Sequence, residues 1–291
     1  MHRAMVFIFL AIGFPQDRYE SPAMKSLADA ERGFAAMSVE KGTREAFVAN
    51  FADDGIAFQP HPVVYKEAVQ GRPAPANPKA YTLNWKPVAG DVSESGDLGY
   101  TTGPYSVIDN SGKQPPRYGF YFSIWKKDSL SRWHVALDIG IETPGKHEGS
   151  DDFRQAESIR NRTSAAAQAK SGKGELEESE ENFSSLAATQ STVAAYESHL
   201  ASDCRLHAEG HHPFVGKAAI KSFFTGKRRT RFLFASVSGS NDVGYTYGSY
   251  TSFGNEGAKE SGYFGHVWKR NEHGRWKLVA EILSPIPPET P

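Results

Sequence analysis

The sequence GDLGYTTGPYS, residues 96–106, decides the fold because a close variant of it occurs near the other end of the chain. Residues 240–251 read SNDVGYTYGSYT, so the pattern Gly-Tyr-Thr-x-Gly-x-Tyr is present twice, once from Gly99 and once from Gly244. Solenoid proteins repeat a unit of roughly 20–50 residues many times over. A pattern that recurs once, more than a hundred residues away, indicates a duplicated domain instead.

Three further blocks match between the two parts of the chain, in the same order. They are ERGFAAM (31–37) with EENFSSL (180–186), GFYFSIWK (119–126) with GYFGHVWK (262–269), and RWHVALDIG (132–140) with RWKLVAEIL (275–283). Shared order, similar spacing and matching tryptophans are not expected by chance. The sequence therefore predicts two copies of one domain, each of roughly 120 residues, which is an ordinary domain size.

The domain boundaries follow from where the similarity ends. We predict a first domain at residues 22–144 and a second at 175–288, joined by a linker at 145–174 that ends in the polar stretch AAAQAKSGKG. A chain of 291 residues is expected to hold about two domains. Hydrophobic residues make up 39% and charged residues 23%, which is typical of folded rather than disordered chains.

The N-terminus, MHRAMVFIFLAIGF, differs in composition from the rest. Arg3 precedes an apolar run at residues 4–14, which is too short to cross a bilayer as a helix but fits the core of a secretory signal. We predict a signal peptide at residues 1–18, a periplasmic or secreted protein, and no membrane association after removal of the signal. The alternative is an N-terminal helix that is partly buried.

Hydrophobic periodicity changes along each copy. Apolar residues recur at helical spacing near the start, as at Leu27 and Phe34, and VGKAAIKSFF (215–224) predicts a third helix in the second copy. Prolines at the matching place, between residues 73 and 78, predict that this helix is broken or missing in the first copy. The later segments alternate with period two, which predicts strands joined by hairpin turns. We therefore predict the α+β class, with helices packed on one face of a curved antiparallel sheet in each copy.

Several of these segments together resemble a known superfamily. FADDGIAF (51–58), GDLGYTTGPY, YGFYFSIWK and RWHVALDIG are similar to nuclear transport factor 2-like proteins, and more narrowly to their SnoaL-like and ketosteroid isomerase-like bacterial branch of domains of unknown function. The resemblance implies that each copy is a cone-shaped domain of three helices packed on a strongly curved antiparallel sheet, with a pocket in its open end. It also implies pairing through the sheet, which two domains of one chain or a homodimer can satisfy. It implies no particular reaction, because this fold carries isomerases, cyclases, dehydratases and proteins without known activity.

Charge, cysteine content and motifs exclude several classes of function. The formal net charge is −1, so no overall field attracts nucleic acid or an anionic membrane. A single cysteine, Cys204, excludes an internal disulfide and a cysteine-based metal site. The sequence has no glycine-rich phosphate loop, zinc-protease motif or nucleophile elbow, so we predict no cofactor.

A carboxylate recurs at one place in the last strand of each copy, as Asp138 and Glu281. The isomerases of the resembled family use a carboxylate base with a phenol or acid, so both residues are catalytic candidates. Asp138 alternates with the apolar Leu137 and Ile139, which favours the outer sheet face or a domain contact for its side chain. The alternative is that this face lines the pocket.

The densest polar cluster is RLHAEGHHPF, where an extended strand would place His207, Glu209 and His211 on one face. His207 and Glu209 are therefore further catalytic candidates. Two imidazoles and a carboxylate can also bind Zn²⁺, but the spacing matches no standard site, so we predict no metal and favour contacts with a polar ligand at a pocket mouth. The matching place in the first copy has Phe58, with His61 close by.

Aromatic and histidine side chains supply the candidate ligand-binding residues, although core packing explains aromatic stripes equally well. The candidates are Phe58, His61, Trp85, Tyr100, Tyr121, His207, His211, Tyr245 and Tyr250. The favoured hypothesis is an exported protein that binds a small, largely apolar molecule in cone-shaped pockets. One alternative is an isomerase or lyase that acts on a carbonyl compound through a carboxylate–tyrosine or histidine pair. Another is an interaction module in which the two copies pair internally.

Overall fold

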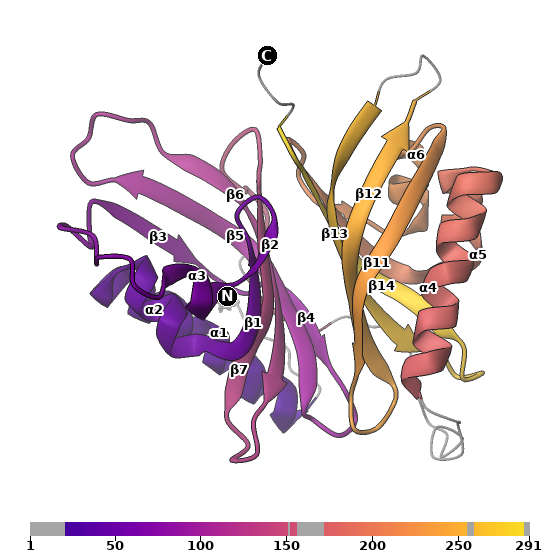
Figure 1. Cartoon of the computed structure of the whole chain (residues 1–291), viewed down its shortest axis with the longest axis horizontal. Coiled ribbons are helices and arrows are strands. Elements are labelled where there is room, and N and C mark those ends of the chain that lie inside the picture. The colour runs from indigo at the N-terminus through magenta and orange to yellow at the C-terminus, as the bar shows by residue number, and fades with distance from the viewer. Residues whose placement is uncertain (1–20, 151, 156–171, 255–258, 288–291) are drawn as a thin grey trace, which may run out of the picture.

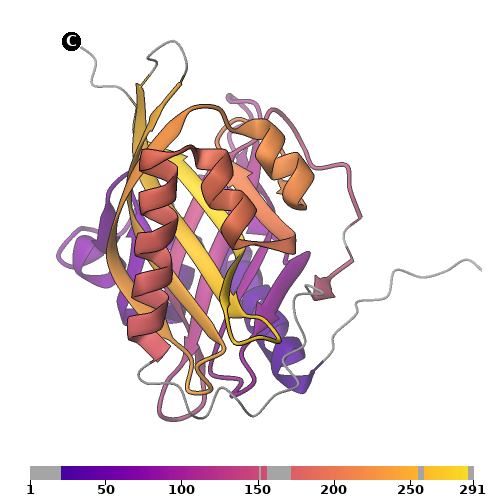
Figure 2. The ribbon, with the colours of Figure 1, turned by 90° about the vertical axis from the view of Figure 1, so that its right-hand side faces the viewer.

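The computed structural model describes residues 21–150, 152–155, 172–254 and 259–287 (Figure 1). The predicted signal peptide at 1–18 lies outside these residues, as does most of the polar part of the predicted linker. Each half of the chain places its helices on one face of a curved sheet, and the two sheets pack against each other through their other faces (Figures 1 and 2). We call the helix-covered faces the inner faces and the opposed ones the outer faces. No helix among the described residues has the length and apolar character that a membrane span requires.

The first half forms one sheet with the strand order β2-β1-β7-β6-β5-β4-β8, and β3 also pairs with β5. Its helices are α1 (Pro22–Lys41), α2 (Thr43–Asn50) and α3 (Tyr65–Val69). Its strands are β1 (Phe51–Phe58), β2 (Pro62–Val64), β3 (Tyr81–Trp85), β4 (Ala89–Val92), β5 (Leu98–Asp109), β6 (Arg117–Lys127), β7 (Trp133–Glu142) and β8 (Arg154–Gln155).

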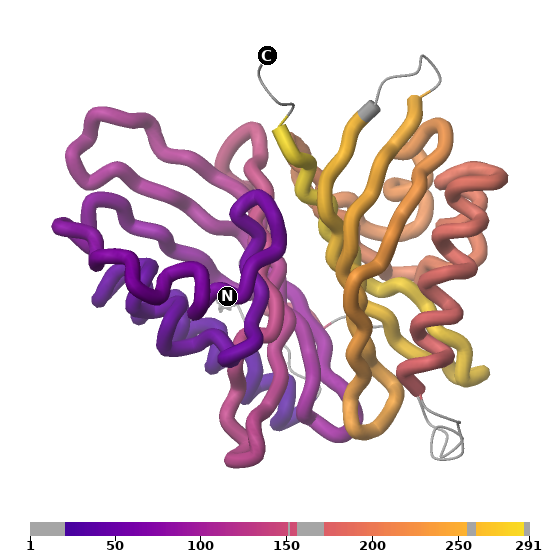
Figure 3. The backbone as a smooth tube through the Cα atoms, viewed as in Figure 1, coloured from indigo at the N-terminus to yellow at the C-terminus, as the bar shows by residue number. Residues whose placement is uncertain are grey.

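The second half repeats this arrangement with the strand order β10-β9-β14-β13-β12-β11. Its helices are α4 (Gly172–Thr189), α5 (Thr192–His199) and α6 (Lys217–Phe223). Its strands are β9 (Leu200–Ala208), β10 (Phe214–Val215), β11 (Lys227–Val237), β12 (Val243–Phe253), β13 (Lys259–Arg270) and β14 (Trp276–Pro285). The α+β class predicted from the sequence is confirmed. The halves share one order of elements, except that β3 and β4 of the first half correspond to the single strand β11 and that β8 has no counterpart (Figures 1 and 3).

The sheets are mixed, so the prediction of purely antiparallel sheets is wrong. β5, β6 and β7 form an antiparallel meander, but β1 lies parallel to β7, and β9 lies parallel to β14. A parallel pair needs a long crossover connection. The chain supplies one here, because β1 directly follows the helices whereas its partner β7 is the last strand of the meander.

Prolines shape the first half differently from our prediction for its third helix. That helix is present as α3, which is only five residues long and ends before Pro73, whereas α6 has seven residues. A further proline, Pro87, separates β3 from β4 where the second half has the continuous strand β11. Proline has no backbone N–H to donate to a sheet ladder, so it interrupts the strand at this point.

Local signals explain the helix starts. Ser21 caps α1 by accepting a hydrogen bond from the backbone N–H of Met24 at 3.1 Å, with Pro22 in the first turn. Ser191 caps α5 in the same way through Ala194, also at 3.1 Å. α2 begins at Thr43 after Gly42 and has no side-chain cap.

The outer faces of the two sheets form one hydrophobic core. Leu137 and Ile139 of β7 belong to it, and a Cβ added at Gly265 of β13 would lie 3.2 Å from Ile139 Cδ1. The predicted outer-face position of Asp138 is therefore wrong. Its neighbours Leu137 and Ile139 are buried against the other sheet, so the apolar stripe of β7 does not mark the face that meets the helices.

The repeated motif distributes its residues between the two faces. Tyr100 and Tyr245 lie in the core between the sheets, whereas Thr101 and Thr246 point to the inner faces, where each donates a hydrogen bond to a buried glutamate. Gly103 and Gly248 sit where neighbouring backbone crosses closely. A Cβ at either position would overlap a backbone oxygen. The motif therefore occurs in both halves because its tyrosine, threonine and glycine make the same kinds of contact in each.

The turns that precede the two motifs contact each other reciprocally. The N–H of Ser95 donates to Ser240 Oγ at 3.0 Å, and the N–H of Ser240 donates to Ser95 Oγ at 3.1 Å. The other reciprocal bonds run from Gly239 N–H to Asp97 Oδ2 (2.9 Å) and from Glu94 N–H to Asp242 Oδ2 (3.0 Å). Such equivalent exchange is the pattern of a two-fold interface between identical subunits.

The predicted linker contributes to the first half. Arg154–Gln155 form β8 beside β4, and Phe153 is fully buried in the aromatic core beneath α1. Burial of a phenylalanine side chain contributes on the order of 2 kcal/mol. The first domain therefore extends beyond the boundary at residue 144 that the similarity indicates.

The motif glycines provide a test of this fold. We expect Gly248→Ala to lower the free energy of unfolding by about 2 kcal/mol or more, because its Cβ would overlap the backbone oxygen of Arg231. Gly33→Ala, in the open middle of α1, should instead raise it by about 0.5–1 kcal/mol. Urea unfolding of both variants makes the comparison. Equal effects would contradict the close approach.

Candidate functional site

Each inner face has a buried glutamate that is held by a threonine and a tryptophan. In the first half, Glu31 of α1 is 0% exposed and accepts hydrogen bonds from Trp85 Nε1 at 2.6 Å, Thr101 Oγ1 at 2.5 Å and Trp125 Nε1 at 2.7 Å. These donors come from β3, β5 and β6. Glu31 therefore ties the first helix to three neighbouring strands.

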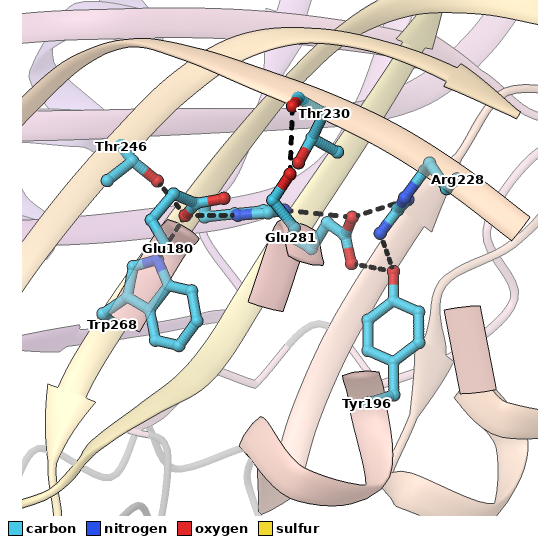
Figure 4. A network of polar contacts seen from close by, with 9 residues as sticks. Glu180, Tyr196, Arg228, Thr230, Thr246, Trp268 and Glu281 are labelled. Atoms are coloured by element: carbon cyan, nitrogen blue, oxygen red, sulfur yellow. Dashed lines mark hydrogen bonds and ion pairs between the residues drawn. The ribbon is translucent and has the colours of Figure 1, made fainter. Parts of the chain in front are cut away.

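Glu180 of α4 has the same role in the second half. It accepts hydrogen bonds from Thr246 Oγ1 at 2.7 Å and Trp268 Nε1 at 3.0 Å, as Figure 4 shows. A third partner differs between the halves, because His266 Nδ1 lies 2.9 Å from Glu180 Oε2. The glutamate anchor is thus shared, and the second half adds an imidazole to it.

Glu281 extends this network toward α5. His266 Nε2 and Arg228 Nη1 lie 3.1 and 3.0 Å from Glu281 Oε1, and Tyr196 Oη donates to Glu281 Oε2 at 2.5 Å. Arg228 Nη2 in turn donates to Tyr196 Oη at 2.6 Å (Figure 4). Both imidazole nitrogens of His266 face carboxylates, so both must donate and the ring is positively charged. Two carboxylates therefore balance two cations.

The charges fix the ionisation of this network. Burial alone would raise the pKa of Glu281, but Arg228 and His266 outweigh it and lower the pKa to about 2. Burial likewise opposes a charged His266, but Glu180 and Glu281 outweigh it and raise its pKa to about 9. The network is therefore fully ionised near neutral pH and has no free acid or base.

The first half keeps two carboxyl groups without these cations. By strand register, Leu83 takes the place of Arg228, and Ser123 takes the place of His266. Burial raises the pKa of Glu31 to about 7. Burial also raises the pKa of Asp138 to about 6, against the hydrogen bond from Ser123 Oγ at 2.6 Å.

A cleft of about 320 Å³ opens beside α6 in the second half. We call it the α6 cleft. Its apolar and aromatic walls include Phe223, Phe224, Tyr250 and Leu283, and its polar lining includes Glu209, His211 and Glu260. Tyr250 Oη donates to Glu260 Oε1 at 2.8 Å. The ring of Tyr250 separates the cleft from Arg228, whose Cζ lies 6.0 Å from the ring centroid.

A second cleft, of about 590 Å³, lies between the first sheet and residues 146–149. Its aromatic lining residues are Tyr105, Tyr118 and the predicted ligand-binding residue Trp85, and its lining does not include Asp138. Its charged and histidine lining differs from that of the α6 cleft, because it contains Lys86, Lys146 and His147 beside a single glutamate, Glu148.

The structure brings three of the predicted residues together in the α6 cleft. These are Glu209, His211 and Tyr250. Asp138, Trp85 and Tyr121 instead lie on the inner face of the first half, where Tyr121 is close to Glu31 and Asp138. Glu281 lies in the buried network of the second half, behind the cleft.

The remaining predicted residues lie between the two sheets. His207 does not share a site with Glu209, because its Nε2 lies 3.3 Å from Thr102 Oγ1 and burial lowers its pKa to about 3. Tyr100 and Tyr245 are buried in the same core. Phe58 packs against Tyr247 and Tyr263, and His61 Nδ1 lies 2.8 Å from Tyr263 Oη. These five side chains join the halves, so we omit them from the candidate site.

Sequence reasoning found Glu281 but missed the other charged residues of the buried network. Glu31 and Glu180 stand at matching positions in the aligned helical blocks, and a charged residue shared at the start of an otherwise apolar stripe is the signal that could have found them. Arg228 lies in a short basic run that resembles a solvated turn, and nothing local distinguishes it. Within the described ranges, no group of three or more His, Cys, Asp or Glu side chains is arranged to hold a metal ion.

No family model matches the chain, and no curated protein matches it. Solved structures that match include a protein of unknown function with a cystatin-like fold from Nostoc punctiforme, which is 18% identical over 39% of this chain and 90% of that chain, with a TM-score of 0.32. Another match is a protein provisionally assigned as a scytalone dehydratase from Novosphingobium aromaticivorans, which is 13% identical over 45% of this chain and 91% of that chain, with a TM-score of 0.33. A third is a protein provisionally assigned as a ketosteroid isomerase from Parabacteroides distasonis, which is 14% identical over 40% of this chain and 88% of that chain, with a TM-score of 0.31. These descriptions agree with the resemblance noted from the sequence. At such scores they carry no conclusion about function.

The buried network can be tested by replacing Arg228 with the leucine that the first half has. We expect Arg228→Leu to lower the free energy of unfolding by about 3–5 kcal/mol, because it leaves Glu281 with one cation instead of two. Adding Glu281→Gln should restore more than half of that loss. Urea unfolding at pH 7 measures both, and a loss below about 1 kcal/mol for Arg228→Leu alone would contradict the charge balance.

The raised pKa of Asp138 predicts how stability depends on pH. Its folded pKa of about 6 exceeds the ordinary value of 3.8, so the folded state binds the proton more tightly and its contribution falls as pH rises from about 4 to 6. The free energy of unfolding of Asp138→Asn, relative to that of the wild type, should therefore rise by on the order of 2–3 kcal/mol between about pH 4 and pH 6. Above pH 6 the difference between the two proteins should stay constant. A difference that does not change with pH would refute the shift.

Proposed function

We propose that the chain binds a small molecule in the α6 cleft. The observation that carries the proposal is the cleft itself, which combines about 320 Å³ of space with walls formed by Phe223, Phe224, Tyr250 and Leu283. Ligand sites are typically concave, largely apolar and fitted with a few polar groups, and this volume is at the small end of their range. The polar side chains of Glu209 and Glu260 can orient a ligand at the rim.

The electrostatics of the second half favour binding over catalysis there. A general base needs a pKa near the working pH. The pKa of Glu281 is lowered to about 2, and its oxygens already contact Arg228, His266 and Tyr196. The charged network therefore supports the inner wall of the α6 cleft. It does not offer a proton acceptor to a ligand there.

The second candidate function is proton transfer by the first half. Asp138 has a raised pKa of about 6 and is only partly buried, and Tyr121 lies nearby, which is the carboxyl–phenol combination that isomerases and lyases use on carbonyl compounds. Neither cleft described above includes Asp138 in its lining, so binding in the α6 cleft is the stronger proposal. A pKa of Asp138 near 3.8 would remove the basis of this alternative.

Filling the α6 cleft tests the proposed function. The neutral probe 3-tert-butylphenol has 11 heavy atoms and should bind the wild type with a dissociation constant of about 1 mM or tighter, as measured by saturation-transfer NMR or calorimetry. Ser252 lines the cleft and is partly exposed, so Ser252→Trp should place an indole in it and weaken binding at least tenfold. The control Ser111→Trp, in an exposed turn, should bind as the wild type does. Equal binding by both variants would place the probe elsewhere.

A further inference from the structure

The walls of the α6 cleft present aromatic rings to a ligand. Phe223 and Phe224 meet edge to face with ring centroids 4.8 Å apart, and Tyr250 forms another part of the lining. Phe224 is held from behind by Tyr196, which stacks on it at 4.7 Å. Aromatic faces carry partial negative charge and attract cations within about 6 Å. Rigid rings of this kind are therefore suited to an organic cation as well as to a neutral group.

The polar lining of the cleft is acidic. Glu209 and Glu260 both line it, and neither forms an ion pair with any residue in the described part of the chain. Each uses one oxygen for a neutral donor: Glu209 accepts from the backbone N–H of Glu142 at 3.1 Å, and Glu260 accepts from Tyr250 Oη at 2.8 Å. Their charges thus remain uncompensated by described side chains at the edge of an apolar space.

Basic groups are scarce on this side of the aromatic wall. Among the residues described on either side of the gap at 255–258, the cleft lining contains no lysine or arginine side chain, and its histidine, His211, has Nδ1 2.9 Å from the backbone oxygen of Glu209. Arg228 lies behind the wall, with Cζ 5.2 Å from the ring centroid of Phe224, and its Nη1 is 3.0 Å from Glu281 Oε1. Its positive charge is therefore balanced before it reaches the cleft.

We propose that the ligand of the α6 cleft is a small organic cation, such as an amine or a quaternary ammonium compound with an apolar body. This inference rests on the proposed binding function and names the ligand class for the same site. Aromatic rings and two carboxylates both favour positive charge, whereas an anion would be repelled by Glu209 and Glu260. A neutral ligand would gain the apolar contacts alone.

A matched pair of probes separates the ligand class from the binding function. 3-Hydroxyphenyltrimethylammonium has the shape of 3-tert-butylphenol, with a charged nitrogen in place of the quaternary carbon. We expect the cation to bind the full chain about tenfold more tightly than the neutral probe, as measured by calorimetry at low ionic strength. Equal or weaker binding of the cation would overturn the cation proposal while the neutral probe still reports the cleft. Failure of both probes to bind would overturn the binding function itself.

Neutral substitutions of Glu209 and Glu260 test whether these two carboxylates cause the preference for the cationic probe. Glu260→Gln and Glu209→Gln keep an oxygen for Tyr250 and for the Glu142 N–H but remove the charge, so each should reduce the cation-to-neutral affinity ratio about threefold. Glu272→Gln, in the exposed turn between β13 and β14, serves as the control and should leave the ratio unchanged. An unchanged ratio in both test variants, or an equal loss in the control, would show that the cleft carboxylates do not select the cation and would overturn the proposal.

Discussion

The burial of two sheets against each other is the constraint on which the rest of the structure depends. The outer faces form one core that includes Leu137 and Ile139 from the first half and Val267 and Ile282 from the second. Strands in this position are covered on both sides, by the opposite sheet and by their own helices. The two inner faces are thereby separate from each other, on opposite sides of the shared core. The reciprocal hydrogen bonds of Ser95 and Ser240 hold the two sheets in equivalent positions.

The inner faces of the two halves share a buried glutamate but differ in the charged residues around it. Glu31 and Glu180 each tie the first helix of their half to a threonine and a tryptophan on the sheet. The second half surrounds its glutamate with balanced charges and stays ionised, whereas the first half leaves Glu31 and Asp138 without cations and raises their pKa values by burial. The same backbone therefore holds a rigid ionic layer in one half and a pair of protonatable carboxyls in the other.

The duplication and the α+β class are predictable from the sequence because they depend on local periodicity and on matching blocks. The facing of Asp138 is not, because its apolar neighbours pack against the other sheet, and the pattern of one strand does not distinguish such packing from packing against helices. The parallel pairing of β1 with β7 joins segments that are far apart in the chain and has no local signal. His207 and Glu209 illustrate the same limit: strand alternation places them on one face, but His207 is fixed by Thr102 of the other half. Phe153 lies in a polar segment of the sequence, and only its packing against the aromatic core of the first half makes it a core residue.

Joining the two halves in one polypeptide has a consequence for how they can evolve. A tether of ordinary length keeps its two ends at an effective concentration on the order of millimolar, so partners linked in this way meet without depending on expression level. The interface of Ser95 and Ser240 therefore does not have to be tight enough to assemble free subunits. In a symmetric dimer every substitution would also appear in the partner. In a tandem chain the α6 side can specialise for recognition while the other side retains a different chemistry.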